Sequence, residues 1–221
     1  MDDVIQQFFN LEIMANALPA VMRGLGVTLM LCAVVVPMGL LGGFLAALGS
    51  LSPRRALRWP VIVLVDFFRA IPPLVLLIFI YAGLPFAGLR ISPFTAVVIA
   101  FFLNNAAYYG EILRAGVLSV GTGQSEAARS TGLGARQTML HIVLPQAVRN
   151  VLPDLISNTV EVVKLTALAS VVSLGEMLYT AEMVRSRTYN ASPMILAAGI
   201  YLAMLWPLVR LVSRFERRVS A

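Results

Sequence analysis

An uncharged run of amino acids, GLGVTLMLCAVVVPMGLLGGFLAALGSLSP, occupies residues 24–53 and determines the class of fold. An α-helix of about 20 apolar residues is long enough to cross the hydrocarbon core of a bilayer, and this run exceeds that length. A strand of a membrane β-barrel would instead alternate polar and apolar residues over about 10 positions. The run therefore predicts a spanning helix, which satisfies its own backbone hydrogen bonds in lipid.

Three further uncharged stretches of similar length follow, at residues 70–89, 91–110 and 188–209. A fifth span must be assembled from residues 142–181, where prolines and charged residues interrupt the apolar pattern. We expect a spanning helix followed by broken helical pieces in that region. The sequence thus predicts an all-α integral membrane protein with about five spanning helices, and residues 1–221 form a single transmembrane domain.

Composition agrees with this class of fold and excludes several others. Of the 221 residues, 59% are hydrophobic and 13% are charged, whereas soluble domains average about 25% charged residues. The single cysteine, Cys32, excludes an intrachain disulfide, and the single histidine, His141, excludes a multi-histidine metal centre. We therefore predict neither a catalytic nor a metal-binding set of side chains. His141 is better explained as a residue of a protein interface than as a ligand.

The positions of the arginines predict the orientation in the membrane. Basic residues follow the first, third and fifth predicted spans, and the positive-inside rule makes these connections cytoplasmic. We expect the amino terminus outside, as a retained acidic tail, and the carboxyl terminus in the cytoplasm of a bacterium, across its inner membrane. The net charge of +6 follows from these arginines, which lack interleaved aromatics, so no nucleic-acid partner is expected. The cytoplasmic set is Arg54, Arg55, Arg58, Arg129, Arg136, Arg214, Arg217 and Arg218, and the opposing set is Arg90, Arg185 and Arg187.

Asp66 and Arg69 lie close to the start of the second span, at a depth where ionised groups are costly. They either pair with each other at a spacing of three residues or mark the entry into the membrane. The break at Ile71-Pro72-Pro73 favours the second explanation, because proline cannot continue a helix. We expect a helix at the membrane edge through Arg69 and a span at residues 70–89.

The connection at residues 121–145 carries the strongest functional signal. Gly121 should end the preceding helix, Ser125 can cap a new helix of about two turns, and Gly132 can end that helix in a left-handed conformation. A second short helix should run from about Ala135 to the end of the segment. Helices this short are marginal alone in water, so we expect this cytoplasmic projection to dock on a partner protein.

Seven residues of this segment form a spaced pattern: Glu126, Ala127, Ala128, Gly132, Ile142, Leu144 and Pro145. This pattern resembles the EAA motif of the permease subunits of ABC importers. The resemblance implies a coupling helix, which inserts into a groove on a separate ATPase subunit and transmits its ATP-driven closure to the membrane helices. An ordinary amphipathic loop is the alternative.

The resemblance extends to the polar amino acid subfamily of these permeases and covers nearly the whole chain. Phe-Arg-Ala-Ile-Pro at residues 68–72, Ala-Tyr-Tyr-Gly-Glu-Ile-Leu-Arg-Ala-Gly at 107–116 and Lys-Leu-Thr-Ala-Leu-Ala-Ser at 164–170 carry it. Leu165 stands where the subfamily commonly has aspartate. The pattern is most similar to permeases of the glutamate and aspartate type, and it implies the type I ABC importer fold.

The chain lacks a phosphate-binding loop, and its sole lysine lies in an apolar stretch. We therefore expect no cofactor on this chain and ATP with Mg²⁺ on a partner ATPase. Five spans enclose a pathway poorly, which predicts pairing with a second permease subunit, identical or paralogous. The resemblance adds an extracytoplasmic amino-acid-binding protein, and membrane lipid is the remaining partner.

Polar side chains within the spans are the candidates for contact with a solute, because lipid makes them costly otherwise. Asn104, Tyr108 and Glu111 follow one helical face, and hydrogen bonding between packed helices is the alternative explanation for them. A second set follows in the fourth region, where a self-contained ion pair is equally possible. That set is Asn158, Glu161 and Lys164.

Together these features predict the permease subunit of an ABC importer that moves polar amino acids by alternating access. Arginines near the predicted pathway favour acidic or amide solutes, whereas its glutamates would suit basic ones. The alternative is a permease of the same architecture for methionine, a basic amino acid or a quaternary amine. A secondary carrier would be expected to show internal repeats of hydropathy, and five unequal spans show none.

Overall fold

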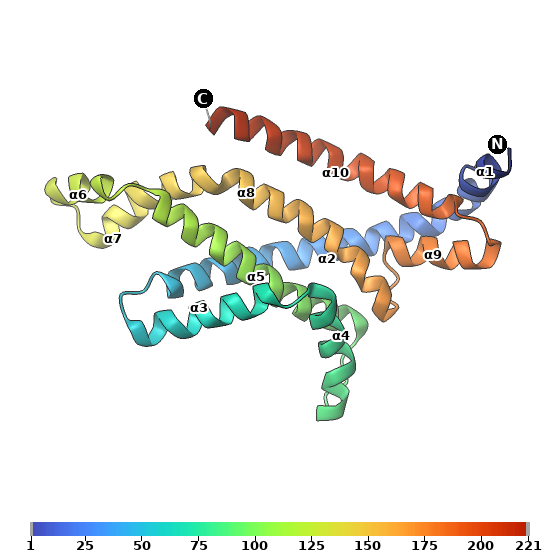
Figure 1. Cartoon of the computed structure of the whole chain (residues 1–221), viewed down its shortest axis with the longest axis horizontal. Coiled ribbons are helices and arrows are strands. Elements are labelled where there is room, and N and C mark those ends of the chain that lie inside the picture. The colour runs from blue at the N-terminus through green and yellow to red at the C-terminus, as the bar shows by residue number, and fades with distance from the viewer. Residues whose placement is uncertain (1, 220–221) are drawn as a thin grey trace. The chain divides into compact units, whose positions relative to one another are not determined.

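The computed structural model describes residues 2–219, and every element in that range is a helix (Figure 1). Four helical stretches are long and apolar enough to cross a membrane, and a fifth is added if two helices around Ile71 count as one broken span. The predicted all-α class with about five spans is therefore confirmed. The side chains of Arg214, Arg217 and Arg218 lie outside the described part. The four stretches are Asp3–Ser50, Pro93–Ser119, Ala135–Val172 and Ser192–Arg210.

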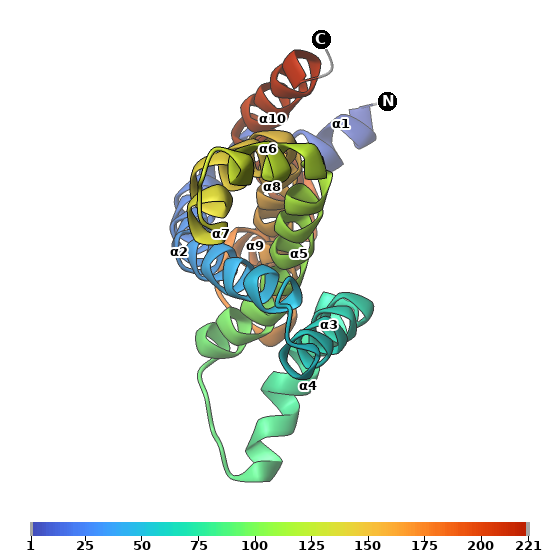
Figure 2. The ribbon, with the colours of Figure 1, turned by 90° about the vertical axis from the view of Figure 1, so that its left-hand side faces the viewer.

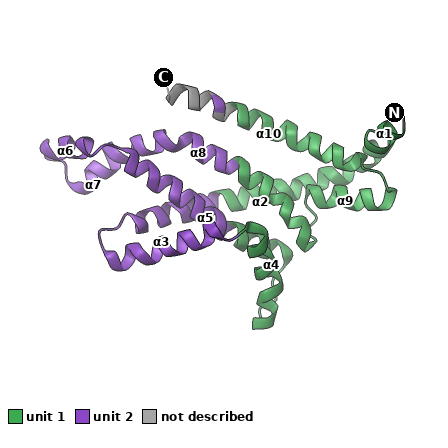
Figure 3. Ribbon diagram, in the orientation of Figure 1, with its two compact units in different colours: residues 1–36, 72–101, 160–210 green, residues 37–71, 102–159, 211–221 purple. Residues whose placement is uncertain are grey.

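The chain divides into two compact units, coloured separately in Figure 3. The first unit contains residues 1–36, 72–101 and 160–210, and the second contains residues 37–71, 102–159 and 211–221. Four long helices contribute residues to both units: α2 (Leu11–Ser50), α5 (Pro93–Ser119), α8 (Leu144–Leu165) and α10 (Ser192–Val219).

The first unit packs the beginning of α2 against α9 (Met177–Thr188) and α10. Its core is built from Ala17, Val21, Met177, Ala181 and Ala197. Small residues permit this close approach of helices, as is usual in membrane proteins. The unit also contains α1 (Asp2–Phe8), α4 (Pro73–Gly83) and two 3₁₀ segments, η1 (Leu84–Ala87) and η3 (Thr166–Val172).

The second unit packs the end of α2 against α5 and α3 (Arg55–Ala70). A Cβ atom added at Gly43 would lie 2.5 Å from Cβ of Tyr109, and one added at Gly110 would lie 2.9 Å from Cβ of Ala46. Both glycines therefore allow two backbones to approach more closely than larger residues would. Tyr109 is fully buried, and its hydroxyl lies 2.8 Å from Oγ1 of Thr159 on α8.

Two short helices project from this unit between α5 and α8. They are α6 (Thr122–Ser130) and α7 (Ala135–Thr138), and the π-helical segment η2 (Met139–Val143) joins α7 to α8. Figure 2 shows α6 and α7 lying across one end of the unit, beside each other. The predicted two-helix projection is thus present, and its surroundings are described below.

The second span departs from the expectation of one helix over residues 70–89. α4 has 11 residues, and at about 1.5 Å per residue it is too short to cross a core of about 30 Å. The prolines at 72 and 73 end α3 at Ala70, so this region forms two helical pieces bent by 97° at the break instead of one straight helix. The third span is also longer than the uncharged run at residues 91–110, because Glu111 and Arg114 pair with each other inside α5.

Candidate functional site

The first helix of the predicted coupling segment is α6, which begins one residue after Gly121. Gly121, rather than the expected Ser125, occupies the N-cap position, and no side chain caps the helix. Glycine is acceptable there because its backbone leaves the first N–H groups accessible to water. The helix therefore begins about a turn earlier than predicted, and Glu126 lies in its middle instead of its first turn.

The turn after α6 has the geometry that the sequence predicts. Gly132 has a φ of +90°, in the left-handed region that favours glycine. The N–H of Leu133 donates to the carbonyl of Ala128 at 3.3 Å, and the hydroxyl of Thr131 donates to the same carbonyl at 2.7 Å. These bonds satisfy a carbonyl that the end of the helix would leave without a donor.

The chain continues through Pro145 without a break, which corrects the expectation that a short helix ends there. Leu144 donates its N–H to the carbonyl of Met139, five residues back, so the preceding turn is π-helical. Pro145 has no N–H of its own, and a widened turn accommodates its ring at the start of α8. The side-chain amide of Gln146 donates to the carbonyl of Ile142 at 2.8 Å.

The matching residues of the motif divide into an exposed set and an inward set. Glu126 and Ala127 are exposed, while Ala128 is buried where α6 packs against α7 and η2. Ile142 and Leu144 are half-buried at the base of this projection, and Pro145 is exposed. The segment therefore exposes the carboxylate of Glu126 and the methyl group of Ala127 on one side of α6, while the other side of α6 packs against α7 and η2. Such a surface suits docking on another protein.

The face of α5 that carries Asn104 and Tyr108 contacts the end of α3. The prolines at 72 and 73 have no N–H, so the carbonyls of Phe68 and Arg69 lack their α-helical donors. Nδ2 of Asn104 donates to the Phe68 carbonyl at 3.1 Å, and the Tyr108 hydroxyl donates to the Arg69 carbonyl at 3.4 Å. Hydrogen bonding between helices, the alternative in the sequence analysis, is thus present for both residues.

Four charged side chains lie together beside these bonds. Arg114 forms a bidentate pair with Glu111, with Nε to Oε2 at 2.9 Å and a second contact at 2.5 Å. A guanidinium nitrogen of Arg69 lies 3.9 Å from carboxylate oxygens of both Glu111 and Asp66. The guanidinium of Arg69 also lies 5.6 Å from the ring centre of Tyr108.

This charged cluster borders a small cavity of about 160 Å³ in the second unit. Asp66, Glu111 and Arg114 are among the residues that line it. The sequence placed Glu111 in the pathway and left two explanations for Asp66 and Arg69, a pair at a spacing of three residues or markers of the membrane edge. The favoured explanation was the membrane edge, but the structure places the two charged groups 3.9 Å apart. Their spacing of three residues before a double proline was the available signal, although nothing local showed that they meet α5.

The second predicted set lies on α8. Glu161 and Lys164 form the expected ion pair, and both side chains are at least half exposed. Asn158 precedes them on the same helical face, and its Nδ2 is buried without a hydrogen-bond partner. Asn158 belongs to the second unit, whereas Glu161 and Lys164 belong to the first. Of these residues, only Glu161 and Lys164 contact each other in the structure. A solute-binding role stays a prediction for Asn158, Glu161 and Lys164.

Sequence reasoning did not select Glu176, the buried carboxylate of the first unit. It is fully buried and accepts hydrogen bonds from the N–H groups of Leu178 at 2.9 Å and Tyr179 at 2.7 Å. The Tyr201 hydroxyl donates to it at 3.3 Å. Glu176 is the N-cap of α9, a position that serine, threonine, asparagine or aspartate usually occupies, so nothing local in the sequence marked it.

A polar surface surrounds the turn between α9 and α10 in the same unit. Tyr189 is exposed with a φ of +52°, an unusual conformation for a bulky residue. Arg185 donates from Nε to Glu182 at 2.7 Å, and this hydrogen bond lowers the pKa of the Glu182 carboxyl below its ordinary value. A cavity of about 350 Å³ lies beside these residues and is lined in part by Gln7 and Asn190.

Residues 39–221 match the family model described as "Binding-protein-dependent transport system inner membrane component". The arginine transport system permease protein ArtQ of Bacillus subtilis is 32% identical, over 92% of this chain and 94% of its own. The glutamate/aspartate import permease protein GltK of Escherichia coli O6:H1 is 34% identical, over 96% of this chain and 99% of its own. A crystal structure of an amino acid ABC transporter with histidines contains a chain that is 36% identical, with a TM-score of 0.86 and coverage of 93% and 96%.

Proposed function

The chain belongs to the family of binding-protein-dependent transport system inner membrane components, and from this membership we propose that it is the permease subunit of an ABC importer for polar amino acids. The observation that carries the proposal is the segment at residues 121–145, which projects from a membrane protein and presents Glu126 outward on a short helix. Relatives named for amino acid transport match nearly the whole chain and support this class of solute.

The segment at residues 121–145 is the coupling element of this proposal. α6 docks into a groove of an ATPase subunit, and closure of the ATPase pair pushes on α6. The turn at Gly132 passes this push to α7, and because α7, η2 and α8 are continuous with one another, the push then reaches α8. ATP and Mg²⁺ are bound by that partner, and this chain supplies no part of the hydrolytic site.

The remaining partners are a second permease subunit and an extracytoplasmic amino-acid-binding protein. A second subunit, identical or paralogous, completes the wall of the pathway, since five spans enclose little space. The binding protein meets the polar surface around Tyr189, where α1 is fixed by a hydrogen bond of 2.8 Å from the Asn190 amide to the Gln6 carbonyl. This assignment requires the amino terminus outside and the carboxyl terminus in the cytoplasm.

The solute contacts polar side chains on α5 and α8 during passage. Tyr108 and Glu111 are partly exposed beside Arg69, and Glu161 and Lys164 offer a carboxylate and an ammonium group together. A pair of opposite charges suits the zwitterionic backbone of an amino acid. We favour acidic or amide side chains, because Arg69 and Arg114 lie near this path. Relatives named for arginine and for glutamate are similarly identical to this chain, so overall identity does not decide the charge.

Reconstituted uptake tests the proposed function. The chain is placed in proteoliposomes with a partner ATPase and an amino-acid-binding protein from the same organism, and labelled glutamate, glutamine and arginine are offered in competition. We expect uptake that requires enclosed ATP and the binding protein, with glutamate or glutamine preferred. Uptake that persists without ATP, or that follows a proton gradient, would refute the ABC importer assignment. A preference for arginine would refute only the solute preference.

A further inference from the structure

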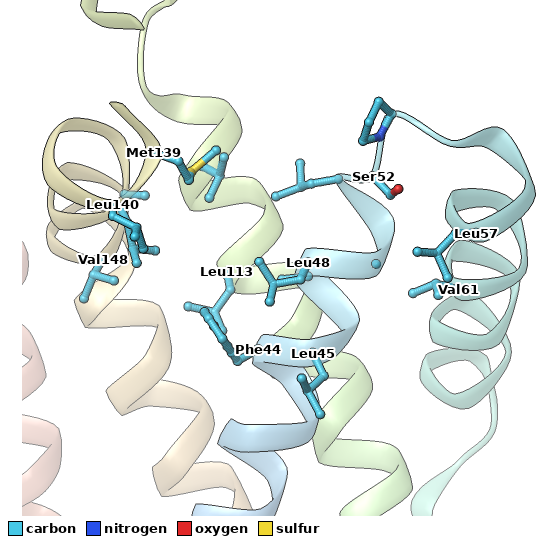
Figure 4. Close-up of a pocket in the computed structure, with 17 residues that line it drawn as sticks. Phe44, Leu45, Leu48, Ser52, Leu57, Val61, Leu113, Met139, Leu140 and Val148 are labelled. Atoms are coloured by element: carbon cyan, nitrogen blue, oxygen red, sulfur yellow. The ribbon is translucent and has the colours of Figure 1, made fainter. Parts of the chain in front are cut away.

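An apolar cavity of about 600 Å³ lies within the second unit, near the start of α3 (Figure 4). Phe44, Leu45 and Leu48 of α2 form its centre, and Leu57 of α3 and Leu140 of η2 form two of its walls. Leu45, Leu48 and Leu57 are 60%, 52% and 51% exposed, so the cavity opens on the surface of the unit. Its lining is almost entirely carbon, and a hydrocarbon chain is the chemistry that fits it.

Three arginines lie at the edge of this cavity. Ser52 and Pro53 line the cavity, and Arg54 and Arg55 follow them directly in the chain. Arg58 follows Leu57, which also lines the cavity. None of the ion pairs among the described side chains includes these arginines. The first turn of α3 contains no acidic residue and no side-chain cap, so its N–H groups add to the attraction for an anion. The site is therefore apolar inside and positive at its edge.

Trp59 indicates the depth at which the edge of the cavity lies in the bilayer. It follows Arg58 directly on α3 and is 58% exposed. Tryptophan and arginine side by side are typical of the zone where lipid headgroups meet the hydrocarbon core. The arginines therefore lie at the depth of phosphate groups, and the cavity lies at the depth of acyl chains.

We propose that this cavity binds an anionic phospholipid, with its acyl chains between α2, α3 and η2 and its phosphate held by Arg54, Arg55 and Arg58. A zwitterionic lipid fills the cavity equally well but gains less from the arginines. Each basic residue near a membrane surface enriches anionic lipid about fivefold, so three arginines make a strong preference.

The lipid contacts the coupling segment, because Met139 and Leu140 line the same cavity. This step rests on the proposed function, whereas the binding of the lipid does not. The acyl chains fill the space between the base of the segment and the ends of α2 and α3. Anionic lipid therefore supports the position from which α6 engages the ATPase, and coupled ATP hydrolysis should increase with its content in the membrane.

Quenching of a tryptophan placed in the lining tests the lipid site. Trp59 and Trp206, the two tryptophans of the chain, are replaced by phenylalanine, and Leu57, whose side chain lines the cavity, is replaced by tryptophan. The full chain with Leu57→Trp, Trp59→Phe and Trp206→Phe is reconstituted into phosphatidylcholine vesicles that contain a minor share of lipid brominated on its acyl chains, and brominated phosphatidylglycerol is compared with brominated phosphatidylcholine at equal content. We expect phosphatidylglycerol to quench the tryptophan at position 57 more strongly, with an apparent enrichment of at least about fivefold.

Two sets of variants separate the headgroup site from a general attraction of the protein for anionic lipid. The triple change Arg54→Gln, Arg55→Gln and Arg58→Gln should reduce the preference to about one. The matched control replaces three exposed arginines outside the cavity, Arg23, Arg90 and Arg187, by glutamine and removes the same charge. This control should keep the preference, because those arginines do not border the cavity.

The cavity itself is tested by filling it. Leu48→Phe with Leu140→Phe should weaken quenching by both lipids, while Leu41→Phe, an exposed change outside the lining, should not. Equal quenching by the two lipids, or a preference that survives the triple glutamine change, would overturn the proposal. Quenching by neither lipid would also overturn it, because a protein surface would then cover the cavity. The assay uses neither ATP nor solute, so its result is independent of the proposed transport function.

Discussion

Asn104 and Tyr108 replace two backbone donors that the prolines at 72 and 73 remove. Asn104 is almost fully buried, so Asn104→Leu leaves the Phe68 carbonyl without a partner in a dry environment. A stranded buried carbonyl costs about 1–3 kcal/mol. We expect Asn104→Leu to lower the thermal unfolding midpoint of the purified protein in detergent by several degrees.

Tyr108→Phe should have a smaller effect than Asn104→Leu, because its hydrogen bond is longer and the side chain is 36% exposed. Tyr189→Phe is the matched control, since the structure shows no hydrogen bond from this exposed hydroxyl. An unchanged midpoint for Asn104→Leu would contradict the role of these side chains in holding the end of α3.

Glu161 and Lys164 allow a direct test of contact with the solute. Replacing both by methionine removes opposite charges together, so neither is left unpaired. We expect the double variant to assemble with its ATPase and to transport at least about tenfold more slowly, because charged hydrogen bonds to the solute are lost. Single variants should change the affinities for glutamate and arginine in opposite directions. Near-normal uptake by the double variant would remove both residues from the proposed pathway.

At the scale of elements, the turn after α6 depends on the left-handed backbone of Gly132. A Cβ atom there meets no neighbour within 4 Å, so a substitution acts through backbone strain rather than a clash. Gly132→Val should cost about 1–2 kcal/mol locally and redirect α7, which should reduce co-purification of the ATPase. Gly134→Val is the control in the same turn, because its backbone is extended and suits valine. Equal retention of the ATPase by both variants would contradict this account.

The sequence predicts the helical elements well where one local signal dominates. Uncharged runs identified the spans, and Gly132 identified the turn, because each depends on residues adjacent in the chain. The ends of elements were less predictable. α5 continues beyond its first charged residue because Glu111 pairs with Arg114, and α8 begins at Leu144 with Pro145 in its first turn because the preceding π-helical turn accommodates the ring. The pattern of apolar, charged and proline residues along the chain does not show that an ion pair or a widened turn will let a helix continue past a charge or a proline.

At the scale of the whole molecule, the orientation rests on the arginines and can be tested by labelling. In a Cys32→Ala background, single cysteines at Ser130 and Ser186 sample α6 and α9, and both positions are exposed. A membrane-impermeant maleimide added to intact cells after removal of the outer barrier should label the cysteine at 186 and spare the one at 130. The reverse pattern would place the coupling segment on the wrong side of the membrane.

Long-range contacts limited what could be predicted of the candidate site. The spacing of Asn104, Tyr108 and Glu111 identified one face of α5, but the partners of that face are Phe68 and Arg69, about 40 residues earlier in the chain. The lipid cavity was equally hard to predict, because its walls come from five helical elements, α2, α3, α5, η2 and α8. Contacts between residues so far apart in the chain can be identified only from the folded structure, and not from the sequence pattern of one helix.

The most direct test of the central claim concerns Glu126, the exposed carboxylate of α6. In the proposed function, a separate ATPase drives this chain through α6. Glu126→Lys reverses the charge at that contact and should reduce both co-purification of the ATPase and ATP-dependent uptake at least about tenfold, because an unmatched charge at an interface is costly. Glu12→Lys, an equally exposed reversal near the amino terminus, is the control and should change neither. A Glu126→Lys protein that inserts normally, retains its full complement of ATPase and transports at the normal rate would contradict the account.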